Sequence, residues 1–241
     1  MLRCVNSPKN VTATGDLECI DALNDVMAEK GVFARRLQVN VAYHSFYMED
    51  IAAKYAILIE EIVPKSIEGK PRNPGDALPV FSSVTITRLA LESFSNPEYW
   101  VSKLASKVRF LDALSQISSY LLMQRPSKQT GKDLLIEFGP HAALQRTVKD
   151  ILDKIVRSDN IGYDSLLKRD MSSLENCLEF LGRIRCSGYM VDLTLANSPR
   201  LKERRILSCL SIFHRTHSII HNRTGQGAGS VGISDAGTCE A

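Results

Sequence analysis

Apolar positions in the first 42 residues change from a strand-like to a helical period and back again. Residues 11–14 form a short β-branched run, which Gly15 closes, and Asp16 is a suitable N-cap for a helix. Apolar side chains at helical spacing predict an amphipathic helix over residues 17–30, with Gly31 at its C-cap. Alternating apolar and polar residues then predict a half-buried strand over 33–41. Together these segments predict one βαβ-like unit.

The rest of the folded part alternates between helical and strand-like patterns. An apolar stripe predicts a helix from residue 46 to about 62, ended by Pro64, and a surface loop over 65–79. Strands are predicted over 79–85 and 134–138, and helices over 97–104, 109–122, 142–156 and 172–186. This alternation favours an α/β fold class. The pattern decays after Leu195, and we expect residues 223–241 to be disordered.

Composition excludes several classes of protein. A 44% hydrophobic fraction is that of an ordinary globular core, and a formal charge of +3 without a basic, aromatic-interleaved stripe argues against a nucleic-acid partner. Apolar runs are too short or too charged for a membrane span. The six cysteines show no paired spacing, which favours reduced thiols in a cytoplasmic protein and no metal site.

Two histidines are candidates for chemistry. His44 follows the strand predicted over 33–41, and an imidazole titrates near neutral pH, which suits a general base. The alternative for His44 is an ordinary hydrogen-bonded turn residue. Ser45 is not a good nucleophile for it, because adjacent residues of an extended segment point to opposite faces. His141 ends a Gly-Pro-His turn between a strand and a helix, and it either lines a cleft or only closes the turn.

Several segments, taken in order, resemble the acyltransferase domain of fungal-type highly reducing polyketide synthases over residues 2–195. They are CVNSPKNVT (4–12), GVFARRL (31–37), AYHS (42–45), FSSVT (81–85), YWV (99–101), VRF (108–110) and IEFGPH (136–141). The resemblance implies a ferredoxin-like small subdomain over 1–42 and the C-terminal part of an α/β-hydrolase-like large subdomain over 43–195. Residues 196–241 depart from the family and are expected to be a degenerate linker with a disordered tail.

The resemblance also implies roles for individual residues. His44 resembles the family's base, which takes the proton of a serine in a Gly-His-Ser-x-Gly elbow; this chain contains no such motif. That serine is expected upstream of residue 1, so the isolated chain is expected to be inactive. Tyr43 resembles the residue that favours malonyl over methylmalonyl units. The stretch at Arg109 resembles the one whose backbone carbonyl orients the histidine, and His141 is a possible cleft residue.

The implied substrate is malonyl-CoA, an acyl-CoA, and the implied acceptor is the phosphopantetheine arm of an acyl carrier protein. Neighbouring synthase domains are the other expected partners, and no bound cofactor is expected in this part. The alternative function is a catalytically dead remnant that acts only as a carrier-protein or synthase interaction module.

Overall fold

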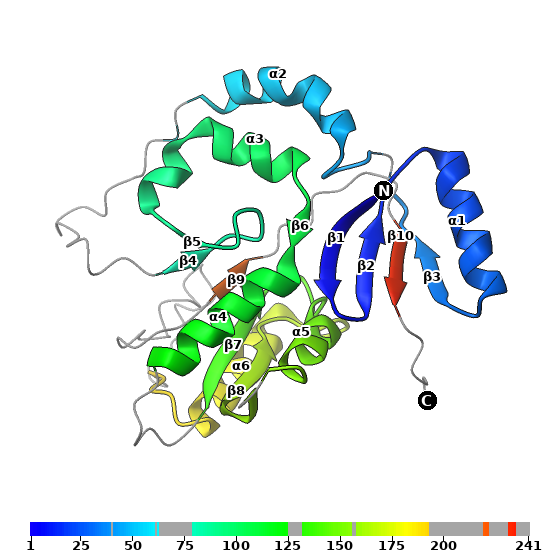
Figure 1. The fold of residues 1–241 in the computed structure, drawn as a ribbon. Helices are drawn as coiled ribbons and strands as arrows, with labels where there is room; N and C mark the ends of the chain where they lie inside the picture. Colours follow the sequence, from blue (N-terminus) through cyan, green and yellow to red (C-terminus); the bar gives the residue numbers. More distant parts are fainter. Residues whose placement is uncertain are drawn as a thin grey trace. The chain divides into compact units, whose positions relative to one another are not determined.

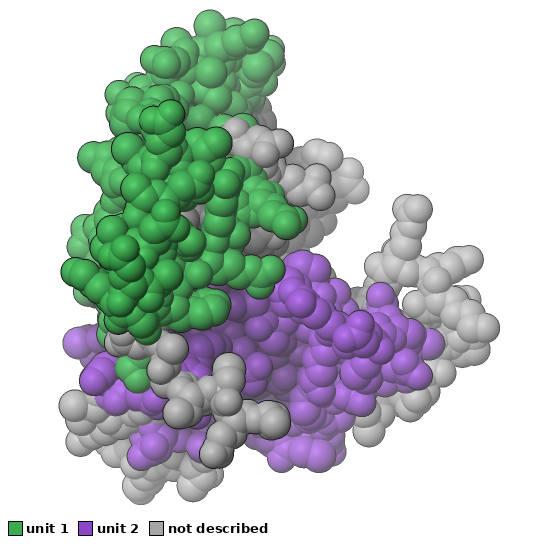
Figure 2. All heavy atoms as spheres, turned by 90° about the vertical axis from the view of Figure 1, so that its right-hand side faces the viewer, with its two compact units in different colours: residues 1–117, 225–241 green, residues 118–224 purple. Residues whose placement is uncertain are grey.

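A computed structural model describes residues 1–39, 41–60, 62, 79–124, 132–155, 158–192, 219–221 and 231–234. The chain forms two compact units, residues 1–117 with 225–241 and residues 118–224 (Figure 2). The division falls within helix α4 (Phe110–Gln124). The family subdomain boundaries predicted at residues 42 and 195 are a different kind of division, and they stay predictions.

The first unit contains a five-stranded sheet in the order β3-β10-β2-β1-β6 (Figure 1). β1 (Leu2–Ser7) and β2 (Asn10–Ala13) form an antiparallel hairpin, and β6 (Val108–Arg109) pairs parallel to β1. β10 (Val231–Ser234) lies between β2 and β3 (Phe33–Arg36) and is antiparallel to both. β2 and β3 are therefore parallel to each other, as a βαβ-like unit requires.

Helix α1 (Leu17–Glu29) confirms the helix predicted over 17–30. Its Ile20 is buried, and Gly31 adopts a φ of 65°, the left-handed conformation that favours glycine after a helix. The strand predicted over 33–41 is too long, because β3 ends at Arg36, where its pairing with the four-residue β10 also ends. The β10 strand itself corrects the expectation of disorder at 231–234. Its Val231 and Ile233 are β-branched and suit a strand.

After β3, a 3-10 turn, η1 (Phe46–Met48), leads into α2 (Glu49–Ile59), which contacts α3 (Pro97–Ala105). The side chain of Asn96 caps α3 by accepting the Glu98 N–H at 2.9 Å. A single strand over 79–85 is wrong: the structure has a hairpin of β4 (Val80–Phe81) and β5 (Arg88–Leu89), followed by η3 (Leu91–Ser95).

Ser82 explains why that hairpin turns where it does. Its hydroxyl accepts the Val84 N–H at 3.1 Å, and its backbone carbonyl accepts the Ile86 N–H at 2.8 Å. These bonds close a tight turn in a segment whose residue types alone predict an extended strand. The surface loop predicted over 65–79 lies almost entirely outside the described residues.

The second unit is built on a parallel sheet in the order β8-β7-β9. The central strand, β7 (Asp133–Phe138), confirms the strand predicted over 134–138, whereas the sequence pattern does not predict β8 (Ile161–Ser165) or β9 (Ile219–His221). Helix α6 (Ser173–Cys186) comes after β8, and its Phe180, Leu181 and Ile184 form a buried core with Leu134 and Ile136 of β7. Helix α5 (Gln145–Leu152) is shorter than predicted, and η4 (Ser158–Asn160) precedes β8.

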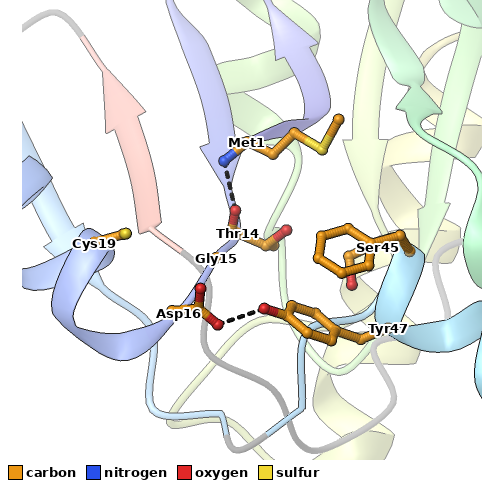
Figure 3. A pocket seen from close by; sticks show the side chains of 8 residues that line it. Met1, Thr14, Gly15, Asp16, Cys19, Ser45 and Tyr47 are labelled. Atoms are coloured by element: carbon orange, nitrogen blue, oxygen red, sulfur yellow. Dashed lines mark hydrogen bonds between the residues drawn. The ribbon is translucent and has the colours of Figure 1, made fainter.

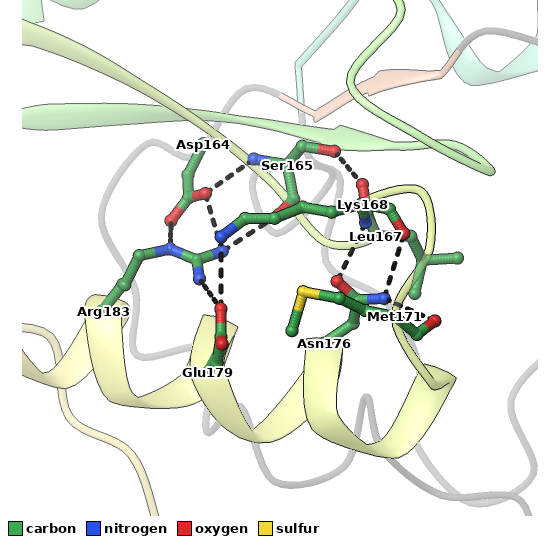
Figure 4. Close-up of polar contacts among 8 residues, drawn as sticks. All are labelled: Asp164, Ser165, Leu167, Lys168, Met171, Asn176, Glu179 and Arg183. Carbon is green, nitrogen blue, oxygen red and sulfur yellow. Dashed lines mark hydrogen bonds and ion pairs between the residues drawn. The ribbon is translucent and has the colours of Figure 1, made fainter.

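Polar contacts join β8 to α6 as well (Figure 4). Arg183 binds the Asp164 carboxylate with two nitrogens, Nε at 2.8 Å and NH2 at 2.9 Å, and its NH1 lies 3.2 Å from Glu179. Beside this pair, the buried Asn176 donates to the carbonyl of Lys168 and accepts its N–H. The bidentate pair fixes the register of the helix on the strand.

Within the described ranges, no helix combines the length and apolar character needed to cross a membrane. In the same residues, no cluster of three or more His, Cys, Asp or Glu side chains has the arrangement of a metal site.

Candidate functional site around His44

His44 lies in a tight turn between β3 and η1. Its φ is 61°, a conformation that is uncommon for residues other than glycine and costs on the order of 1–3 kcal/mol. Two contacts hold the turn: the His44 N–H donates to the Leu104 carbonyl at 3.0 Å, and the buried Ser45 hydroxyl donates to the Ala42 carbonyl. The Ser45 hydroxyl therefore stabilises the turn, and it makes no side-chain cap hydrogen bond to η1.

The imidazole of His44 lies beside the end of α3. Backbone groups of Ser106 and Lys103 lie close enough to favour its protonated form, while Nδ1 is buried with no hydrogen-bond partner among the described residues. The last carbonyls of a helix have no partner inside the helix and carry its negative dipole end. The C-terminus of α3 is thus suited to stabilise a positive charge on this ring.

Burial has the larger effect, and it lowers the pKa of His44 below the ordinary value of 6.5. The positive charges of Lys103 and Arg3 lower this pKa further, and the backbone groups of Ser106 and Lys103 oppose the shift. His44 is therefore neutral near pH 7, the state in which an imidazole can accept a proton.

The other residues singled out from the sequence occupy different environments. The ring of Tyr43 is half-buried, and its centroid lies 6.5 Å from that of His44, with the planes tilted by 51°. Arg109 lies in β6, where its Nε is 2.7 Å from Oδ2 of Asp112 and its N–H donates to the Ser83 carbonyl. Backbone groups of Lys103 and Ser106, which the sequence did not single out, favour the protonated form of the His44 ring.

His141 belongs to the second unit, in the turn after β7. Its Nε2 lies 2.9 Å from NH2 of Arg169. A guanidinium only donates, so Nε2 of His141 is the acceptor in this contact. The turn itself is fixed by Glu137, whose buried carboxylate accepts the N–H groups of Ala143 and Leu144 at 3.1 and 3.0 Å.

Comparison with known proteins shows which family the chain resembles. Residues 1–191 match the family described as the acyl transferase domain. The chain is 34% identical over 207 residues to Highly reducing polyketide synthase 2 of Gibberella zeae, covering 86% of this chain and 8% of that protein. The chain thus spans only a small part of such a synthase.

Solved structures show the same likeness. The acyltransferase domain from module 8 of the salinomycin polyketide synthase matches with a TM-score of 0.64 and 26% identity, over 80% of this chain and 41% of that one. The malonyl CoA-acyl carrier protein transacylase of Clostridium perfringens shares the fold, with a TM-score of 0.51 and 22% identity over 77% and 50%. The chain therefore belongs to the acyl transferase domain family, and its relatives include highly reducing polyketide synthases of fungi.

Proposed function

We propose that this chain carries the histidine part of an acyltransferase site that moves malonyl from malonyl-CoA to the phosphopantetheine arm of an acyl carrier protein. The observation that carries the proposal is the environment of His44: a strained backbone held in place, a lowered pKa, and a helix C-terminus against the ring. Such a group can accept a proton at neutral pH and stabilise the imidazolium that results.

In this proposal His44 acts as a general base and then as a general acid. A serine hydroxyl attacks the thioester carbonyl, and its proton passes to the neutral imidazole. The carbon–sulfur bond then breaks, the proton goes to the departing thiolate, and the acyl group stays on the serine. Transfer to the phosphopantetheine thiol repeats these steps in reverse. The serine comes from a segment outside this chain, because the 241 residues contain no Gly-His-Ser-x-Gly motif.

The remaining candidates have narrower roles in the proposal. Tyr43, which is adjacent to His44 in the chain, narrows the space at the acyl α-carbon and favours malonyl over methylmalonyl. One methyl group is worth about 1–3 kcal/mol in an apolar pocket. Arg109 and His141 are candidate orienting and cleft residues. We place the protein in the cytoplasm, with neighbouring synthase domains as its other partners.

The first test is labelling of the isolated chain with radioactive malonyl-CoA. We expect no stable acyl ester, because the nucleophile is absent from the chain. A hydroxylamine-sensitive label on a serine of this chain would overturn the proposal that the nucleophile comes from another segment.

The second test adds a segment that carries the serine elbow from a related acyltransferase domain, together with phosphopantetheinylated carrier protein. His44→Ala should abolish the recovered transfer. In the unsubstituted chain the acid limb of the pH–rate profile should lie below pH 6.5, since the pKa of His44 is lowered. His141→Gln serves as the comparison histidine. Transfer that survives His44→Ala would exclude His44 as the base.

The second candidate function is that of a non-enzymatic interaction module, and the outer side of α2 favours it. Ile57 and Leu58 are 75% and 71% exposed there, and neighbouring apolar side chains of this kind mark interaction surfaces. Size-exclusion chromatography with and without carrier protein tests it. A monomer that does not co-elute with the carrier would argue against this function.

A further inference from the structure

A pocket of about 200 Å³ opens beside the turn that holds His44 (Figure 3). The end of β2 and the first turn of α1 form one side, and the segment after His44 forms the other. Its lining residues are Met1, Thr14, Gly15, Asp16, Cys19, Ser45, Phe46 and Tyr47. The function proposed above uses none of these side chains as a reacting group.

Thr14 gives this pocket an unused hydrogen-bonding group. The residue is 3% exposed, and its hydroxyl is buried without a hydrogen-bond partner in the part of the chain that the structure describes. The backbone carbonyl oxygen of Thr14 accepts a hydrogen bond from the Met1 amino nitrogen, 2.6 Å away. The side chain points into the pocket, toward the side where Ser45 and Tyr47 lie (Figure 3). A buried hydroxyl without a partner is unfavourable, so a ligand atom that accepts its proton would be stabilising.

Charge and shape limit which ligands fit. Asp16 is the one carboxylate among the described lining residues, and it accepts the Tyr47 hydroxyl, which raises the pKa of Tyr47 and keeps the phenol neutral. The lining also carries the positively charged amino group of Met1, so opposite charges are present and neither an anionic nor a cationic ligand is favoured. The rings of Phe46 and Tyr47 favour an apolar portion. The pocket therefore suits a small neutral molecule with one carbonyl group for Thr14.

Cys19 adds reactivity to the same pocket. It is an exposed residue of the first turn of α1, and its Cβ lies 4.0 Å from the position that a Cβ on Gly15 would occupy. We propose that this pocket binds small neutral carbonyl compounds and that Cys19 is the site at which their thiol-reactive members alkylate the protein. With a chloroacetamide, the Cys19 sulfur bonds to the chlorinated carbon, chloride leaves with the bonding electrons, and the thiol proton goes to solvent.

The test uses the full chain and N-benzyl-2-chloroacetamide, with alkylation of each cysteine followed by peptide mass spectrometry. Cys186, which is also exposed, is the internal control. At low reagent concentration we expect Cys19 to react about tenfold faster than Cys186, the factor that about 1.4 kcal/mol of binding gives. The rate at Cys19 should saturate as the reagent concentration rises, whereas the rate at Cys186 should rise linearly.

Variants separate binding from simple exposure. Thr14→Val should remove saturation at Cys19, Thr14→Ser should restore it, and neither should change the rate at Cys186. Gly15→Ala should slow alkylation of Cys19, because the added methyl group occupies pocket volume. The variant should fold, because the nearest atoms to this methyl group lie 4.0 Å away. A linear rate at Cys19, unchanged by Thr14→Val, would overturn the proposal. Circular dichroism confirms that each variant folds, and the outcome does not depend on the acyltransferase function.

Discussion

Tyr163→Phe should destabilise the second unit by about 2 kcal/mol. The Tyr163 hydroxyl donates to the carboxylate of Glu137, which is 2% exposed and also accepts the N–H groups of Ala143 and Leu144. A hydrogen bond to a charged group contributes about 1.5–3 kcal/mol. Without it, the described residues leave the buried carboxylate two donors, the N–H groups of Ala143 and Leu144. The ring itself is retained, so little apolar burial is lost.

Native-state hydrogen exchange of the β7 and β8 amides measures this loss directly. A destabilisation of about 2 kcal/mol corresponds to roughly 30-fold faster exchange of the amides that open with the whole unit. Tyr189→Phe is the matched control, because its exposed hydroxyl donates to the neutral Lys132 carbonyl at 2.8 Å. That control should accelerate exchange only about two- to fivefold. Equal effects of the two substitutions would refute the role assigned to the Glu137 carboxylate.

Individual groups give four further expected outcomes. Burial, together with the bond to Glu137, raises the pKa of Tyr163 in the folded protein, so the folded state is stabilised fully below pH 10 and loses this stabilisation as the pH rises further. In urea unfolding at alkaline pH, Tyr163→Phe should reduce the fall in stability. Ser172→Ala should cost about 1 kcal/mol in urea unfolding, because Ser172 and Glu175 form a capping box on α6. Ser118→Ala should stabilise by about 1 kcal/mol in the same assay, since this fully buried hydroxyl has no partner in the described ranges. Because the pKa of His44 is lowered in the folded state, the unfolded state takes up a proton first as the pH falls below 6.5, and the stability of the folded state decreases. His44→Gln should reduce this decrease between pH 6.5 and 5.

Helices could be predicted well where periodicity and caps agree. Residues 172–186 predict α6 within one residue, because Ser172 and Glu175 mark the start and Gly188, with a φ of 90°, marks the end. Strand β8 could not be predicted, because Ile161 precedes Gly, Tyr, Asp and Ser, and this sequence alternates too weakly to indicate a strand. Its position is set by parallel pairing with β7 and by the Asp164–Arg183 pair, which are contacts between distant residues.

The start of α5 could not be predicted either, because a contact with a residue of strand β7 shortens the helix. Apolar spacing extends the predicted helix back to residue 142, yet the helix begins at Gln145. Glu137 explains the difference, because its carboxylate binds the N–H groups of Ala143 and Leu144 and keeps those residues in a turn. A buried carboxylate on a strand, eight residues before the helix begins, leaves no periodic signal, so only the folded chain reveals its effect.

In the candidate site, the sequence predicts the functional side chain but not the backbone groups around it. His44 could be singled out from the sequence because the identity of a histidine after a strand is visible, whereas the groups around its ring are largely backbone groups, which every residue has. Lys103 shows the difference most clearly: its backbone raises the pKa of His44 and its ammonium group lowers it. Only the second effect depends on the residue being lysine. A substitution at Lys103 therefore tunes the basicity of His44 without removing the backbone group beside the ring, and this separates the pKa of the base from its position.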